Sequence, residues 1–391
     1  MVNPYTFFAP PQIVFGWGRR SEAGRLAATL GRRAWLLAGS RTLQRTGVID
    51  QLTDSLRTAG LSVESFSAPA HEPEVIDVDR LTDDWRSRGA RAGDCVVAIG
   101  GGSTLDLAKA AAAMVTNRQG SSVVDYLEGV GRGFQITEAP LPMIAIPTTA
   151  GTGTEATKNA VISSYDPPFK KSLRSDQMVP RIVLVDPELT ITVPPDVTAS
   201  TGMDTITQLI ESYISKRAAP IPQALCLQGL HLAWPALPVA VRDGSNRPAR
   251  EAMAHAALLS GMALANSGLG VAHGVAAALG VHCRVPHGLA CAVLLPTALE
   301  LNREVRCREL AEISELLLPG RESTTDAACA RLIGAVQSLC HEIGIPSHLR
   351  DLGVRREQTA DLVPSSHGNS LSGNPRDLSD DELRDVLEAL W

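Results

Sequence analysis

Short apolar runs alternate with amphipathic stretches through the first half of the chain. The apolar runs are rich in aliphatic and β-branched residues and end at turns rich in Gly, Pro or Thr; they cover residues 34–38, 95–99, 143–146 and 182–185. Between them, residues 47–59 and 105–115 carry apolar side chains at helical spacing. Strands that alternate with helices predict a parallel sheet covered by helices on both faces. We therefore expect a Rossmann-like α/β domain in the N-terminal half.

The pattern changes after Pro194-Pro195-Asp196. From Thr198 onward, long stretches rich in Ala and Leu follow helical spacing, and no strand is predicted. Residues 252–283 contain no Asp, Glu, Lys or Arg, and we interpret them as a buried helix pair rather than a membrane span. The prediction is two domains: residues 1–196, an α/β domain, and residues 197–391, an all-helical domain.

Composition narrows the class of protein. The 391 residues are 44% hydrophobic, enough for a full core, and the formal net charge of −6 comes from interspersed charges. No basic face for nucleic acid and no polybasic membrane anchor is predicted. The seven cysteines are scattered and form no CxxC pair, and the N-terminus lacks a signal peptide pattern, so we expect reduced thiols in a cytoplasmic protein.

A glycine-rich turn follows one of the predicted strands. The strand at 95–99 leads into Gly100-Gly101-Gly102-Ser103-Thr104, and a predicted helix follows. Glycines let the backbone approach a ligand closely, and the N–H groups at a helix N-terminus favour an anion such as a pyrophosphate. A tight turn with Ser103 as the helix N-cap is the alternative for these residues alone, and the segment is not the GxGxxG fingerprint.

Six collinear segments carry distinctive motifs. They are GGGSTLDLAK (100–109), PTTAGTGTEATKNAVI (147–162), VDPELT (185–190), TGMDTITQLIESYIS (201–215), VPHGLACAVLLP (285–296) and NPR (374–376). Together they resemble the iron-containing alcohol dehydrogenase family, which shares its fold with dehydroquinate synthases. The resemblance covers nearly the whole chain, and it implies that residues 1–196 are the NAD(P)-binding domain and residues 197–391 the metal and substrate domain. It implies a nicotinamide cofactor, NADP or NAD, and the residues that bind it are then Gly101, Gly102, Ser103, Asp106, Thr148, Thr149, Thr152 and Lys170. Lys171 would take the place of Lys170 with a shift of one residue.

Coenzyme preference depends on the residue after the strand at 34–38. Relatives that prefer NAD commonly carry an Asp there, which bonds the adenosine ribose hydroxyls, whereas this chain has Ser40 followed by Arg41. A 2′-phosphate would meet no carboxylate and would gain a cationic neighbour. The residues favour NADP(H), although a surface Arg at a strand end is equally common.

Candidate metal ligands lie in the second half. Asp204 and Gln208 are four residues apart, so both project from one helix face. His273 and His287 are fourteen apart, about 21 Å on one straight helix, so the chain must turn back between them, and Gly280 and Pro286 supply that break. The resemblance implies an iron or zinc site of Asp and three His, which corresponds here to Asp204, Gln208, His273 and His287. Gln208 replaces an imidazole with an amide oxygen, a weaker donor for a transition metal.

A second departure concerns proton transfer. The family often has a second His in the segment that begins at His273, a candidate proton relay, and Ala277 stands at that position. Water, His282 or His367 would have to replace it, unless proton delivery does not limit the reaction.

The resemblance implies reduction of an aldehyde to a primary alcohol, or the reverse, by hydride transfer. The expected catalytic residues are Asp204, His273 and His287. They would hold a divalent metal, which would act as a Lewis acid. We expect a small-molecule aldehyde or alcohol substrate, no nucleic acid or membrane partner, and a homo-oligomer such as a dimer. Two alternatives stay open: a metal-independent reductase resembling maleylacetate reductase, and a cofactor-binding protein without turnover.

Overall fold

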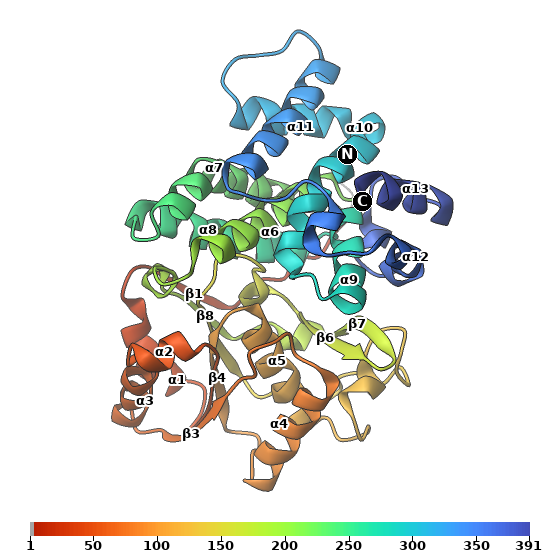
Figure 1. Cartoon of the computed structure of the whole chain (residues 1–391). Helices are drawn as coiled ribbons and strands as arrows, with labels where there is room; N and C mark the ends of the chain where they lie inside the picture. Colours follow the sequence, from red (N-terminus) through yellow and green to blue (C-terminus); the bar gives the residue numbers. More distant parts are fainter. Residues whose placement is uncertain (1–3) are drawn as a thin grey trace. The chain divides into compact units, whose positions relative to one another are not determined.

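The computed structural model describes residues 4–391, which form two compact units (Figure 1). The sheet unit comprises Phe8–Thr149 and Thr154–Thr192. The helical unit comprises Val193–Trp391, the loop Ala150–Gly153 and the described residues before Phe8. The predicted fold class is confirmed, since a parallel sheet with helices precedes a region of helices.

All strands of the main sheet run parallel, in the order β1-β8-β5-β4-β2-β3. The strands are β1 (Gln12–Phe15), β2 (Arg33–Ala38), β3 (Ser62–Ser67), β4 (Cys95–Gly100), β5 (Met143–Pro147) and β8 (Ile182–Val185), and a separate antiparallel hairpin pairs β6 (Asn159–Tyr165) with β7 (Pro168–Arg174). The four predicted strands correspond to β2, β4, β5 and β8. The first strand, the polar β3 and the hairpin were not predicted.

Alternate side chains of the buried strands reach the two faces of the sheet. In β4, Cys95, Val97 and Ile99 pack with one core cluster and Val96 and Ala98 with the other. The first cluster includes side chains of α1 (Ala23–Ala27) and α3 (Val48–Thr58), and the second those of α4 (Val75–Ser87) and α5 (Gly102–Thr116). Because both faces are covered, the central strands are continuously apolar.

The strand register brings three turns to one edge of the sheet. Ala38 pairs with Ile99, and Gly100 pairs with Pro147, so β2, β4 and β5 end side by side. The turn after β2 enters the short helix α2 (Arg41–Arg45), the turn after β4 enters α5, and Thr148 follows β5. Ligands of parallel α/β sheets bind at this carboxyl edge.

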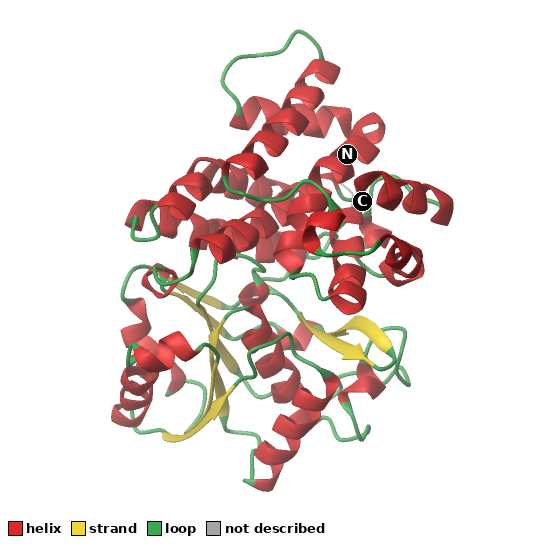
Figure 2. Cartoon of the chain, in the orientation of Figure 1, coloured by secondary structure: helices red, strands yellow, loops and turns green. Residues whose placement is uncertain are grey.

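The helical unit is built around α6, whose residues are buried on nearly every face over its last three turns. Its helices are α6 (Pro195–Ile214), α7 (Pro220–Arg242), α8 (Arg247–Leu264), α9 (Val271–Cys283), α10 (His287–Leu317), α11 (Thr325–Glu342), α12 (Thr359–Ser366) and α13 (Asp380–Leu390). Figure 2 shows helices and loops throughout residues 198–391 and no strand, as predicted. The uncharged segment 252–283 forms most of α8 and all of α9, two largely buried helices.

Helix α7 is the one described helix that is long and apolar enough to cross a membrane, with a mean hydropathy of 1.4 over its best window. It packs against α6 and α8, and core helices pass the same test of length and composition. Length and composition are therefore weak grounds for a membrane span in this helix.

The loop Ala150–Gly153 contacts α8 through two glycines. Gly153 has a φ of +60°, and a Cβ built on it would lie 2.5 Å from Cα of Gly261. A Cβ on Gly261 would in turn lie 2.0 Å from the carbonyl oxygen of Gly153. Backbone therefore meets backbone here, and no side chain fits on either residue.

Candidate active site

The predicted phosphate-binding turn joins β4 to α5. Gly101 is the N-cap residue of α5, and no side chain caps the helix, so the alternative with Ser103 as N-cap is wrong: Ser103 lies inside the first turn. The first N–H groups of a helix have no partner within the helix and favour an anion. The geometry therefore suits a phosphate group at the N-terminus of a 15-residue helix.

Glycine is required for different reasons at different positions in this turn and in the neighbouring turn after β2. A Cβ on Gly100 would lie 2.5 Å from Oγ1 of Thr104, and one on Gly39 would lie 2.0 Å from the same atom, so packing alone excludes side chains there. A Cβ on Gly101 would meet only Thr149, at an ordinary 3.5 Å. The protein itself therefore leaves room at Gly101, where a ligand would need the backbone bare.

Threonines after β5 lie beside the turn. The N–H of Thr148 donates to the carbonyl of Gly100 at 3.0 Å, and the side chain of Thr149 faces Gly101. Thr152 belongs to the helical unit, where its carbonyl accepts a hydrogen bond from Gln208. The structure thus brings Thr148 and Thr149 to the predicted phosphate site.

Asp106 and Lys170, also predicted to bind the cofactor, have protein partners. The carboxylate of Asp106 accepts hydrogen bonds from Oγ1 of Thr154 and the N–H of Val161, and it lies 3.4 Å from Nζ of Lys109. Lys170, on β7, forms an ion pair with Glu72 at 2.6 Å. These contacts give both residues a role in holding the sheet unit together, and their predicted contact with cofactor stays a prediction.

Ser40 is the N-cap residue of α2, and its hydroxyl accepts a hydrogen bond from the N–H of Thr42 at 3.2 Å. Its φ of 75° is unusual for a residue with a side chain. Both Ser40 and Arg41 are exposed at the end of β2.

A second cluster lies in the helical unit, where three helices bring together four potential metal donors. Asp204 on α6, His273 on α9, and His287 and Cys291 on α10 each offer one atom, and these atoms lie within 4.8 Å of one another. Nε2 of His273 is 3.2 Å from Oδ1 of Asp204, and the rings of His273 and His287 are 5.5 Å apart between centroids. One carboxylate, two imidazoles and a thiol suit a divalent transition metal such as zinc, so the residues present fit the metal that the family resemblance implies.

The chain does turn back between the two histidines, but not at both predicted residues. Gly280 lies inside α9, so its part of the prediction is wrong. Helix α9 ends at Cys283, Arg284 adopts a left-handed φ of 57°, and Pro286 is the N-cap residue of α10. Gly288 then lets α10 approach α6, because a Cβ there would lie 2.6 Å from the carbonyl oxygen of Ser200.

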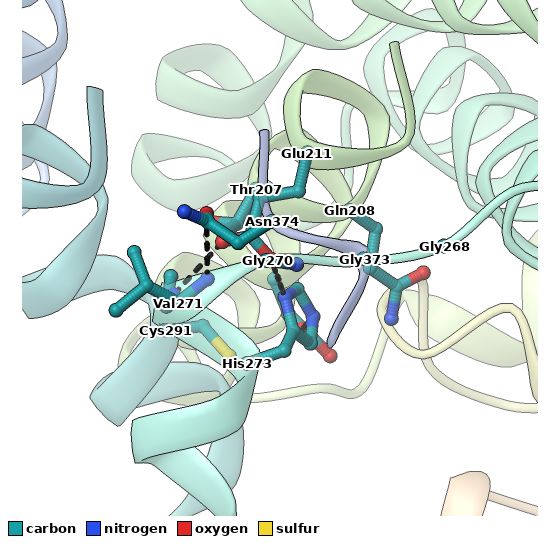
Figure 3. A network of polar contacts seen from close by, with 12 residues as sticks. Thr207, Gln208, Glu211, Gly268, Gly270, Val271, His273, Cys291, Gly373 and Asn374 are labelled. Carbon is teal, nitrogen blue, oxygen red and sulfur yellow. Dashed lines mark hydrogen bonds and ion pairs between the residues drawn. The ribbon is translucent and has the colours of Figure 1, made fainter. Parts of the chain in front are cut away.

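Glu211 orients His273 from one side (Figure 3). Its carboxylate accepts a hydrogen bond from Nδ1 of His273 at 2.7 Å and from the N–H groups of Gly270 and Ala272 at the start of α9. This arrangement places the Nδ1 proton on the Glu211 side and leaves Nε2 to face Asp204. The sequence pattern did not single out Glu211, although it lies seven residues after Asp204 on the same helix.

Asn374 of the NPR segment supports the same helix end. Its side-chain oxygen accepts a hydrogen bond from the N–H of Val271 at 3.2 Å (Figure 3). The same oxygen accepts another from the side-chain amide of Asn302 at 3.0 Å. This motif residue therefore has a structural reason for its place beside the donor cluster.

Charges in the cluster are coupled. Burial opposes ionisation of Asp204, but the hydrogen bond from His273 and the nearby His287 lower the pKa of the Asp204 carboxyl. Burial likewise opposes protonation of His273, but contacts with Cys291, Asp204 and Glu211 raise the pKa of His273 well above its ordinary value. Burial raises the pKa of the Cys291 thiol to about 12.

Gln208, the predicted fourth ligand, makes other contacts. Its Nε2 donates to the carbonyl of Thr152 at 3.2 Å, and its Oε1 accepts from Oγ of Ser260 at 3.0 Å. Figure 3 shows its amide directed away from the imidazole of His273. Cys291, which the sequence pattern did not single out, lies instead with the donors; the signal available was its position one helical turn after His287.

The position of the family's second histidine is Ala277, within α9. The two proposed substitutes have partners of their own. Nε2 of His282 lies 2.7 Å from Oγ of Ser365, and Nε2 of His367 lies 2.8 Å from Oδ1 of Asp380.

Comparisons with known proteins point to one family. Residues 10–187 match the family described as iron-containing alcohol dehydrogenase, and residues 198–391 match the C-terminal family of Fe-containing alcohol dehydrogenases. The NAD-dependent methanol dehydrogenase of Bacillus methanolicus is 32% identical over 385 residues, 98% of each chain. The 1,3-propanediol dehydrogenase of Klebsiella pneumoniae is 35% identical over 391 residues, also 98% of each chain. A crystal structure of a 1,3-propanediol oxidoreductase superposes with a TM-score of 0.92 at 32% identity, covering 100% of both chains.

The chain belongs to the iron-containing alcohol dehydrogenase family. It is a nicotinamide-dependent oxidoreductase that interconverts alcohols and aldehydes. The predicted family, enzyme class and reaction type are confirmed.

Proposed function

We propose that the enzyme reduces a small aldehyde to a primary alcohol, or catalyses the reverse reaction, with a divalent metal held by Asp204, His273 and His287. The observation that carries the proposal is the convergence of these donors, with Oδ1 of Asp204 3.2 Å from Nε2 of His273. Two further findings support the proposal. The matched family is named for its iron, and two relatives are named as dehydrogenases of methanol and of 1,3-propanediol.

When bound, the nicotinamide supplies the hydride and the metal supplies Lewis-acid polarisation of the substrate oxygen. The chain supplies the positions. Asp204 brings the negative charge, the two histidines bring neutral nitrogen donors, and Glu211 holds one of them in the required tautomer. The tight packing of α10 on α6 at Gly288 keeps His287 beside Asp204.

For the cofactor, we propose that residues 1–196 bind it and residues 197–391 carry the metal and substrate. Gly101, Gly102 and Ser103 would receive the phosphates at the start of α5, and Thr148, Thr149, Thr152, Asp106 and Lys170 would line the rest of its path. The uncapped N-terminus of α5 supports the phosphate contact. We propose that NADP(H) is accepted at least as well as NAD(H). The residue after β2 is Ser40 and not an Asp, so no carboxylate there would repel the 2′-phosphate.

The experiment is to strip the protein with a chelator and to follow NADH and NADPH absorbance with a panel of small aldehydes before and after adding zinc, iron or manganese. We expect activity to return with metal, and Asp204→Asn to abolish it. Full activity in stripped protein without detectable metal would contradict the metal site. It would favour a metal-independent reductase, the second candidate, which the engagement of Gln208 by Thr152 and Ser260 supports.

We also propose a cytoplasmic location and a homo-oligomer, a dimer in the simplest case. The seven cysteines are free thiols, as expected in a reducing compartment. The oligomer rests on family resemblance, and light scattering of the purified protein tests it.

A further inference from the structure

Cys291 occupies a position from which it can bind the same metal as the two histidines. It lies on α10 four residues after His287, so both side chains leave one face of the helix. The thiol is buried, and its Sγ lies 3.7 Å from Nε2 of His287. It is also one of the four donors that lie within 4.8 Å of one another.

In the structure, Gln208 does not compete with Cys291 for the place of the fourth metal ligand. Its side chain is 3% exposed, and both ends of its amide take part in hydrogen bonds, with Thr152 and with Ser260. A buried amide that turned toward a metal would lose both of these hydrogen bonds.

The distances between donor atoms match a shared ion. In a tetrahedral zinc site with bonds of about 2.0 Å to nitrogen and oxygen and about 2.3 Å to sulfur, neighbouring N and O donors lie about 3.3 Å apart and N and S donors about 3.5 Å apart. The observed separations are 3.2 Å between His273 and Asp204 and 3.7 Å between His287 and Cys291. The first pair joins α9 to α6, so tertiary packing sets its distance, whereas the second pair lies within α10 at a spacing of four residues.

We propose that Cys291 is the fourth protein ligand of the metal, which gives an Asp-His-His-Cys site suited to zinc in place of the Asp-His-His-Gln set expected from the sequence. A soft thiolate favours zinc over the harder divalent ions. As the bond from sulfur to metal forms, the Sγ–H proton leaves to solvent. The inference rests on the metal site of the proposed function and identifies one ligand of that site.

Cobalt(II) is the probe that detects a sulfur ligand directly. We would add Co²⁺ to chelator-stripped protein and record the near-ultraviolet thiolate-to-cobalt charge-transfer band. The parent should show the band, and Cys291→Ser and Cys291→Ala should lack it. Zinc affinity in a competition with a chromophoric chelator should fall by at least about 100-fold in both variants, beyond the range typical of an outer-shell partner.

Two control variants separate this role from general effects on packing. Cys226→Ala removes another fully buried cysteine of the helical unit and should keep the band and the zinc affinity. Gln208→Ala should keep the band as well, and circular dichroism verifies that each variant is folded. A band that persists in folded Cys291→Ala, or cobalt bound by the parent without the band, would overturn the inference.

Aldehyde reduction measured on the same samples separates an error in the ligand assignment from an error in the proposed function. If the stripped parent binds neither cobalt nor zinc yet reduces aldehydes with NADH, the ligand assignment and the metal site are wrong and the dehydrogenase function stands. If it binds cobalt with the sulfur band but reduces no aldehyde, the ligand assignment stands and the proposed substrate class is wrong.

Discussion

Glu211 accepts the Nδ1 hydrogen bond of His273 at 2.7 Å, and the opposite ring nitrogen of that histidine faces Asp204 at 3.2 Å. The same carboxylate accepts hydrogen bonds from the N–H groups of Gly270 and Ala272, so one side chain fixes both the start of α9 and the imidazole that this helix carries. Orientation of His273 is therefore coupled to the position of the whole helix.

Glu211→Gln should weaken metal binding about 10- to 100-fold, because an amide supports the Nδ1–H tautomer and the helix N-terminus less well than a carboxylate. Zinc competition with a chromophoric chelator measures the change. Glu304→Gln, an exposed substitution on α10, is the matched control and should bind zinc like the parent. Parent-like affinity in folded Glu211→Gln would show that the contact is structural only.

Gly101→Val should raise the dissociation constant of NADH and NADPH by about tenfold or more, roughly 1.4 kcal/mol, because a branched side chain would stand where the phosphates approach the backbone. Fluorescence titration of the reduced cofactor measures it. The contact of a Cβ at this position with Thr149 is ordinary, so the variant should fold. Gly101→Ala should have a smaller effect, and unchanged affinity in the Val variant would refute the turn assignment.

Ser40→Asp should shift the ratio of kcat/KM values toward NADH by about tenfold, because a carboxylate repels a 2′-phosphate and bonds ribose hydroxyls. Asp is also a good N-cap and tolerates positive φ, so α2 should keep its start. Ser40→Asn, which adds a similar size without the charge, should leave the ratio near that of the parent. An equal shift in both variants would point to size rather than charge.

Glu155 should make stability fall as the pH rises from about 4.5 to about 7. Burial raises the pKa of its carboxyl to about 7, so the folded state holds a proton that the unfolded state has already released in this range. The loss should reach about 3 kcal/mol above pH 7 and vanish below pH 4.5. Urea unfolding of the parent and of Glu155→Gln at several pH values isolates it: the variant should gain stability relative to the parent as the pH rises, and a constant difference would contradict the assignment.

The fold was predictable where local pattern and burial agree. The apolar runs that became β2, β4, β5 and β8 are buried on both faces, whereas β3 is polar and half exposed at the edge of the sheet, so periodicity gave no sign of it. In the second half of the chain, the Ala- and Leu-rich stretches at helical spacing that follow Pro194 were sufficient to predict helices throughout.

The candidate site was predictable in its residue types but not in its contacts. The motifs identified Asp204, His273 and His287, and the structure brings them together. Which way Gln208 turns depends on Thr152 and Ser260, which lie on other segments of the chain, and no pattern along the sequence contains that information. The same holds for Asp106, whose partners Thr154 and Val161 are about fifty residues away.

The contact between Gly153 and Gly261 constrains how this sequence can change over evolutionary time. A methyl group on either residue would collide with the backbone of the other, at 2.0 to 2.5 Å, so neither position can mutate first and wait for compensation at its partner. At this crossing, descendants of this chain must either keep both glycines or move the loop and the helix apart in one step, together with the Thr152 carbonyl that accepts a hydrogen bond from Gln208.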